Sequence, residues 1–218
     1  MAKKKNITAQ DLLEWYMDKV LEEGNPPQSV YKFAKDNNFD ESKFYEHFGS
    51  FEAMEDYFMK RIFDLTLEVL DKDEQFDQFS AKDKLLSFYY TFFGNLAQNR
   101  SFTLYLFGSN ASKKVIYQRL MPLKKDFKVF VKNLEVEMIK IKEKNLERLQ
   151  NKSLDEGLWG QFLFIFEFWL NDRSAAFEKT DLLIEKSLKA GFDFIESSPL
   201  HSLLDLGKFM WKEKFTMN

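Results

Sequence analysis

Few residues in this sequence could act as nucleophiles or as general acids and bases at neutral pH. The 218-residue chain contains no cysteine and only two histidines, His47 and His201, which lie far apart in the sequence. Catalysis requires such groups to be held together in one site. Glu135, Glu137 and Glu143 share a stretch with several lysines, which is typical of a solvated ion-pair face rather than of a metal site. The sequence therefore predicts no enzymatic activity and no bound metal or cofactor.

The composition favours a helical protein without a membrane span. Hydrophobic residues make up 44% of the chain and charged residues 31%, with only 8 Gly and 4 Pro. The longest apolar stretch, residues 158–170, is shorter than the roughly 20 residues that a span requires. The opening residues lack the apolar run of a signal peptide, so we expect a cytoplasmic protein without integral membrane association. A net charge of −3 means that any contact with nucleic acid must come from a local patch.

Three short helices are expected in the first fifty residues. Thr8 and Asp11 form a capping pattern for a first helix that Gly24 ends, and a Pro-rich turn follows. A second helix starts at Gln28 or Ser29, and Asn37 and Asn38 end it because Asn tolerates the left-handed backbone conformation. A third helix runs from an N-cap at Asp40 to residues 49–50.

Longer helices are expected in the rest of the chain. Their predicted ranges are residues 52–70, 82–99 behind a Ser80–Asp83 cap, 102–107, 113–149 as one helix or as two broken near Pro122, 153–176 behind a Ser153–Glu156 capping box, 181–196, and an amphipathic stretch over 200–215. We therefore predict a head, residues 1–50, and a larger helical body, residues 51–218.

The order of these elements resembles a known family. Phe33-Ala34, Phe44-Tyr45-Glu46-His47-Phe48 and Ser50-Phe51-Glu52-Ala53-Met54 occupy the places of the helix-turn-helix head of TetR-type transcription regulators. The resemblance covers about the first quarter of the chain. It implies an all-α, TetR-like fold in which a three-helix head places its third helix in the major groove of double-stranded DNA.

The resemblance also implies which residues would contact DNA. The candidates for contacts to phosphates or base edges are Ser29, Glu41, Ser42, Lys43, Tyr45 and His47. The third helix carries more acidic than basic residues, and Phe51 stands where the family usually has a lysine. Both departures reduce the attraction to phosphate that the head could provide.

The aromatic residues of the body could line a cavity for a small apolar ligand or could fill a close-packed core. Regulators of this family bind ligands in the helical body and form dimers through its last long helices. The residues expected to line the pocket are Phe88, Tyr89, Phe92, Phe93, Tyr105, Phe162, Phe166 and Glu167. Those expected in the interface of a two-fold homodimer are Leu158, Phe162, Trp169, Leu183, Leu188 and Phe192.

The sequence thus supports two functional hypotheses. The first is a DNA-binding transcription regulator that responds to an apolar ligand. The alternative is a protein of the same fold that binds lipid and not DNA, similar to the accessory proteins of ubiquinone biosynthesis. The alternative depends on the C-terminal stretch over residues 200–215, whose aromatic residues and lysines would suit a membrane interface.

Overall fold

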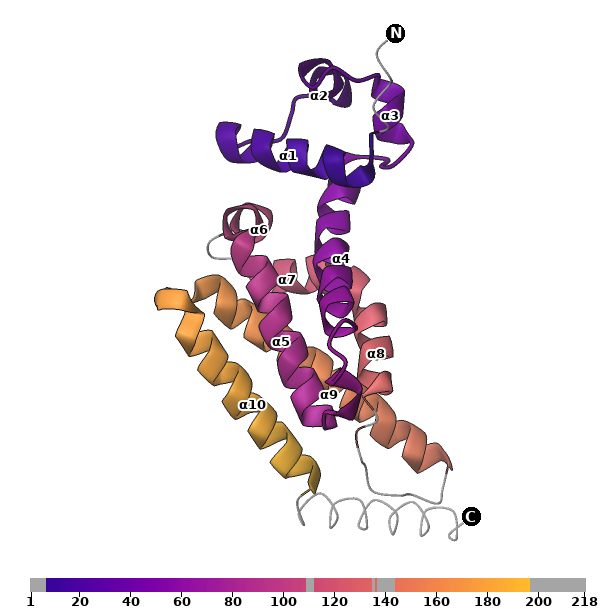
Figure 1. Cartoon of the computed structure of the whole chain (residues 1–218), viewed down its shortest axis with the longest axis vertical. Helices are drawn as coiled ribbons and strands as arrows, with labels where there is room; N and C mark the ends of the chain where they lie inside the picture. Colours follow the sequence, from indigo (N-terminus) through magenta and orange to yellow (C-terminus); the bar gives the residue numbers. More distant parts are fainter. Residues whose placement is uncertain (1–6, 109–111, 135, 137–143, 197–218) are drawn as a thin grey trace, which may run out of the picture. The chain divides into compact units, whose positions relative to one another are not determined.

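Helices are the regular elements of this protein over the part of the chain that the structure describes (Figure 1). The computed structural model describes residues 7–108, 112–134, 136 and 144–196. Its α-helices are α1 (Ala9–Glu23), α2 (Val30–Asp36), α3 (Glu41–Tyr45), α4 (Phe51–Leu70), α5 (Ala81–Gln98), α6 (Arg100–Phe107), α7 (Lys113–Leu120), α8 (Lys124–Asn133), α9 (Lys144–Asn171) and α10 (Glu178–Glu196). The prediction of an all-α fold is confirmed.

Contacts between residues divide the chain into two compact units. The first unit comprises residues 1–68 and 92–123, and the second comprises residues 69–91 and 124–218. The chain passes from one unit to the other within α4, within α5 and just before α8. The predicted head therefore shares a unit with α6 and α7. The domain boundary at residue 50 remains a prediction.

The head helices begin and end where the local sequence signals predict. The Thr8 hydroxyl accepts a hydrogen bond from the Asp11 amide at 3.1 Å, and the Asp11 carboxylate accepts one from the Thr8 amide at 2.9 Å. Gly24 ends α1 with a φ of +71°, and Asn38 follows α2 with a φ of +56°. Only α3 is shorter than predicted, because its α-helical part ends at Tyr45.

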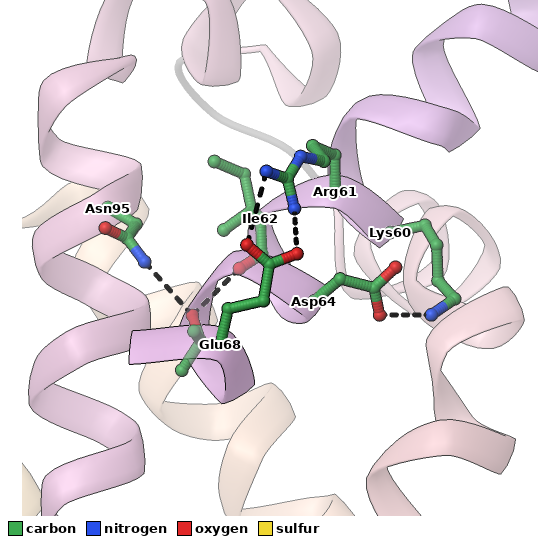
Figure 2. Close-up of polar contacts among 7 residues, drawn as sticks. Lys60, Arg61, Ile62, Asp64, Glu68 and Asn95 are labelled. Carbon is green, nitrogen blue, oxygen red and sulfur yellow. Dashed lines mark hydrogen bonds and ion pairs between the residues drawn. The ribbon is translucent and has the colours of Figure 1, made fainter. Parts of the chain in front are cut away.

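Helix α4 carries a buried polar contact to α5 within the first unit (Figure 2). Thr66, which has no exposed surface, donates its hydroxyl to the Ile62 carbonyl at 2.8 Å and accepts a hydrogen bond from the Asn95 side-chain amide at 3.2 Å. On the outer side of α4, Arg61 pairs with Glu68 and Lys60 pairs with Asp64. The buried contact fixes how α4 and α5 pack, since an unpaired polar group there would be destabilising.

In the second unit, α9 packs against both α8 and α10. Glu156 of α9 accepts hydrogen bonds from Lys124 at 2.8 Å and from Lys128 at 2.6 Å, and these bonds lower its pKa to about 2. The prediction that Ser153 and Glu156 cap a helix start is therefore wrong. Helix α9 runs without a break from residue 144 to 171, and Glu156 lies in its interior, where its side chain pairs with α8 instead.

The connection between α9 and α10 is held by one buried carboxylate. Asp172 accepts hydrogen bonds from the amide and hydroxyl of Ser174, at 2.8 and 2.7 Å, and from those of Thr180, at 2.9 and 2.7 Å. Burial alone would raise the pKa of Asp172, but the bonds from Thr180 and Ser174 outweigh it and hold the pKa at about 2. Asp172 thus stabilises a tight connection in which Ala176 and Phe177 have positive φ.

Among the described residues, the structure contains no helix with the length and hydropathy that crossing a membrane requires. The predicted amphipathic stretch over residues 200–215 lies outside the described residues.

Candidate nucleic-acid interface and ligand-binding body

An aromatic core holds the three head helices together. Phe33 of α2 and Phe44 of α3 have no exposed surface and contact each other edge to face, with their ring centroids 6.3 Å apart. Phe51 contacts both rings, at 5.7 and 5.3 Å, and stacks on Tyr16 of α1 at 5.1 Å. Phe51, the residue that stands in place of the usual lysine, therefore contributes to the core of the head.

The six predicted contact residues all retain access to solvent on or beside α2 and α3. Ser29, Ser42, Tyr45 and His47 are exposed, and Glu41 and Lys43 are half-buried. Tyr45 has 55% of its surface exposed, although its neighbour Phe44 is buried. Tyr31 of α2 is 62% exposed and was missed in the sequence analysis. Its signal was its position in the first turn of α2, two residues before the buried Phe33 and therefore on the other side of the helix from it.

Several of these side chains already have partners within the head. The Ser29 hydroxyl accepts a hydrogen bond from the Lys32 amide at 3.1 Å and so caps α2. His47 Nε2 lies 3.0 Å from the Ile7 carbonyl oxygen. A carbonyl can only accept, so Nε2 donates in this contact. Lys43 Nζ pairs with both carboxylate oxygens of Glu46, at 2.7 and 2.8 Å. Among the contact candidates, Glu41, Ser42 and Tyr45 therefore have side chains that make no hydrogen bond within the described part of the head.

The head neutralises much of its own positive charge. Lys19 pairs with Glu23 at 2.6 Å and with Asp36 at 3.4 Å, and Lys32 pairs with Asp36 at 3.0 Å. The hydrogen bond from Lys32 lowers the pKa of Asp36, so this carboxylate stays charged. Such internal ion pairs leave fewer cations free to meet phosphates.

The predicted pocket residues are divided between the two units, and their role in a pocket remains a prediction. Phe88, Tyr89, Phe162 and Phe166 belong to the second unit, whereas Phe92, Phe93 and Tyr105 belong to the first. In the second unit Phe88 stacks on Phe130 with ring centroids 4.6 Å apart, and the four rings there have no exposed surface. Glu167 is half-buried. The buried aromatic residues of the second unit form a close-packed core.

The indole N–H of Trp159 in that core has no hydrogen-bond partner among the described residues. Trp159 is 2% exposed, and its indole Nε1 is buried without an acceptor. Its ring contacts Phe127 at 5.6 Å and Phe162 at 5.3 Å. An unpaired indole N–H in an apolar core could donate to an acceptor that a ligand brings.

The predicted dimer residues lie mostly inside the second unit. Leu158, Phe162, Trp169, Leu188 and Phe192 are buried, and Leu183 is half-buried. The apolar residues of α9 and α10 that face outward are instead Phe164 (53% exposed), Phe168, Leu182 and Phe194. Near Phe168 there is a surface hollow of about 420 Å³, lined by Phe168, Asn171, Asp172, Arg173, Ser174 and Lys179.

The described residues contain no group of three or more Asp, Glu or His side chains arranged to hold a metal ion.

Comparison with known proteins identifies the body. A family model described as tetracyclin repressor-like, C-terminal domain, matches residues 84–210, which is more than half of the chain. No curated protein matches the sequence. The matched range begins in α5 and includes α6 to α10, whereas the resemblance noted from the sequence lies in residues 29–54. The chain therefore belongs to the tetracyclin repressor-like family, the TetR-type transcription regulators.

Proposed function

We propose that this regulator binds double-stranded DNA through the surface of α2 and α3. The observation that carries the proposal is the arrangement of α3, which buries Phe44 completely and exposes Tyr45 and Ser42 on the other side. Tyrosine and serine hydroxyls donate to phosphate oxygens and to acceptors on base edges. Family membership supports the same conclusion, and it also supports a regulatory rather than an enzymatic role.

We also infer a two-fold homodimer, because operators for such heads consist of two symmetric half-sites. Phe164 and Phe168 lie one turn apart on the outward side of α9, and Leu182 is exposed on the adjacent α10. Exposed aromatic residues at this spacing are costly to leave in water and are typical of interface cores. A second copy of the chain is the occupant that the family favours.

The third part of the proposal is a small apolar ligand with one hydrogen-bond acceptor. The aromatic core of the second unit would bind it, with the Trp159 indole N–H as the donor. Binding would require the rings to separate, because they are close-packed. Such a rearrangement is what could change the spacing of two heads in a dimer.

The DNA-binding proposal can be tested with duplexes selected by the purified protein from a random library. We expect Tyr45→Ala and Ser42→Ala to weaken binding to the selected duplex by about tenfold each, since each removes a hydrogen bond to DNA. Tyr117→Ala is the matched control, because Tyr117 is also exposed but belongs to α7. Equal losses in all three variants would contradict the assignment of the surface.

A further inference from the structure

A nearly buried carboxylate in α4 connects helix α1 of the head to α7. Glu55 is 9% exposed. The Tyr16 hydroxyl of α1 donates to one of its oxygens, Oε1, at 2.7 Å. Arg119 of α7 donates from Nη1 to the other oxygen, Oε2, at 3.0 Å. All three residues belong to the first unit, so their contacts lie within one compact body.

The chemistry of this cluster makes each contact depend on the others. Tyr16 has no exposed surface, and its burial and its bond to Glu55 raise the pKa of its hydroxyl, which therefore stays protonated and donates. Burying a carboxylate costs free energy that a cation or hydrogen-bond donors beside it must offset. Arg119 supplies the cation, and its charge also acts on the neighbouring Glu52 and Asp56.

The position of Arg119 in the chain relates this cluster to the second unit. Arg119 is the penultimate residue of α7, and the turn Met121–Leu123 leads directly into α8, where the second unit begins. Only four residues of chain therefore separate Arg119 from the first residue of α8, Lys124. Tyr16 stands in the middle of α1, next to Trp15, whose ring stacks on Phe39 after α2 at 5.7 Å.

We propose that Arg119 is a positioning residue that couples α7 to the head through Glu55 and Tyr16. While Arg119 holds Glu55, the carboxylate holds the Tyr16 hydroxyl and so fixes α1 on α4. When α7 moves away, Glu55 loses its cation and α1 is released. The effect of this release on DNA binding rests on the function proposed above, whereas its effect on α1 does not.

Amide hydrogen exchange of the full-length protein tests the coupling without DNA. In Arg119→Met, which keeps the length of the side chain but removes its charge, we expect the α1 amides to exchange about tenfold faster. Exchange in α9 and α10 should not change. Arg119→Lys restores a cation and should return α1 exchange close to the wild-type rate, which a purely steric role of the arginine would not do.

A milder variant keeps the test decisive if Arg119→Met does not fold. Tyr16→Phe removes only the hydroxyl, and it should also speed exchange in α1. Combining it with Arg119→Met should give less acceleration than the product of the two single effects, because both act through Glu55. The proposal is overturned if α1 exchange is unchanged in the single variants, if all described helices accelerate equally, or if the two effects multiply.

The DNA readout separates this proposal from the proposed function. For the duplex selected by the wild type, Arg119→Met should weaken binding by about tenfold and Arg119→Lys should not. If the wild type selects no duplex but α1 exchange changes as expected, the coupling holds and the DNA-binding function fails. If the wild type binds DNA and neither exchange nor affinity responds to Arg119, the coupling fails alone.

Discussion

At the scale of single residues, the ion pair between Lys43 and Glu46 limits how strongly α3 can attract DNA. Both side chains are partly exposed, at 36% and 53%. The Glu46 carboxylate pairs with the Lys43 ammonium group, which a phosphate would otherwise contact. Exposed pairs of this kind contribute little to stability. The pair therefore affects binding much more than folding.

We expect Glu46→Gln to strengthen DNA binding at low salt. Removing the carboxylate frees Lys43 for a phosphate, so the slope of log affinity against log salt should become steeper by about one. Binding titrations with the selected duplex over a salt series measure both quantities. Glu23→Gln removes the same charge from α1, outside α2 and α3, and should change the slope less. Identical slopes for the two variants would contradict a contact by Lys43.

Asp172 is expected to make stability depend on pH. Its pKa in the folded protein is about 2, below its ordinary value of 3.8, so its contribution is present above pH 3.8 and is lost as the pH falls through 2. Asp172→Asn cannot accept four hydrogen bonds and should lower the free energy of unfolding by about 2 kcal/mol at pH 7.

The measurement is urea unfolding of wild type and variant at pH 7 and at pH 2.5. The difference in the free energy of unfolding between wild type and Asp172→Asn should be smaller at pH 2.5, because the Asp172 carboxylate of the wild type begins to bind a proton there. Asp193→Asn, at an exposed position of α10, should have the same free energy of unfolding as the wild type at both pH values. A difference of constant size from pH 7 to 2.5 would show that the charge of Asp172 does not stabilise the fold.

At the scale of elements, α9 determines both the core of the second unit and the proposed interface. Phe162 and Phe166 face inward, whereas Phe164 and Phe168 face outward, two residues and therefore about half a helical turn away. We expect Phe164→Glu to yield monomers at micromolar concentration, because a charge in the centre of an apolar interface is strongly unfavourable.

Light scattering coupled to size-exclusion chromatography measures this change directly. Val129→Glu is the matched control, since Val129 of α8 is exposed to the same degree, 52% against 53%. It should leave the dimer intact. A Phe164→Glu dimer as stable as that of the wild type would exclude the outward face of α9 from the interface.

Interactions within one helical turn could be predicted from the sequence, whereas interactions between distant helices could not. Thr8, Gly24, Ser29 and Asn38 act within one turn, so their roles were predictable from the neighbouring residues. Glu156 was misread as a cap because its partners, in α8, are 28 and 32 residues away.

The candidate site was predictable in part for a similar reason. The buried and exposed sides of α3 follow from the spacing of Phe44 and Phe48 around Tyr45. Helix α9 is apolar on nearly every side over residues 158–170, so the sequence alone could not tell which rings face the core. The structure placed Phe162 and Trp169 inside and left Phe164 exposed.

At the scale of the whole molecule, the chain belongs to the TetR-type regulators, and its head shares a compact unit with α6 and α7. The chain passes between the two units within α4, within α5 and before α8. The coupling proposed above uses the last of these passages, because Arg119 lies just before α8.

We propose that the α2–α3 surface of a dimer binds a specific DNA sequence. The most direct test is the ratio of affinities for the duplex selected from a random library and for a scrambled duplex of the same length, at 150 mM salt. We expect a two-fold symmetric motif and a ratio of about a thousand or more. Equal affinities, or no retained DNA even at low salt, would contradict it.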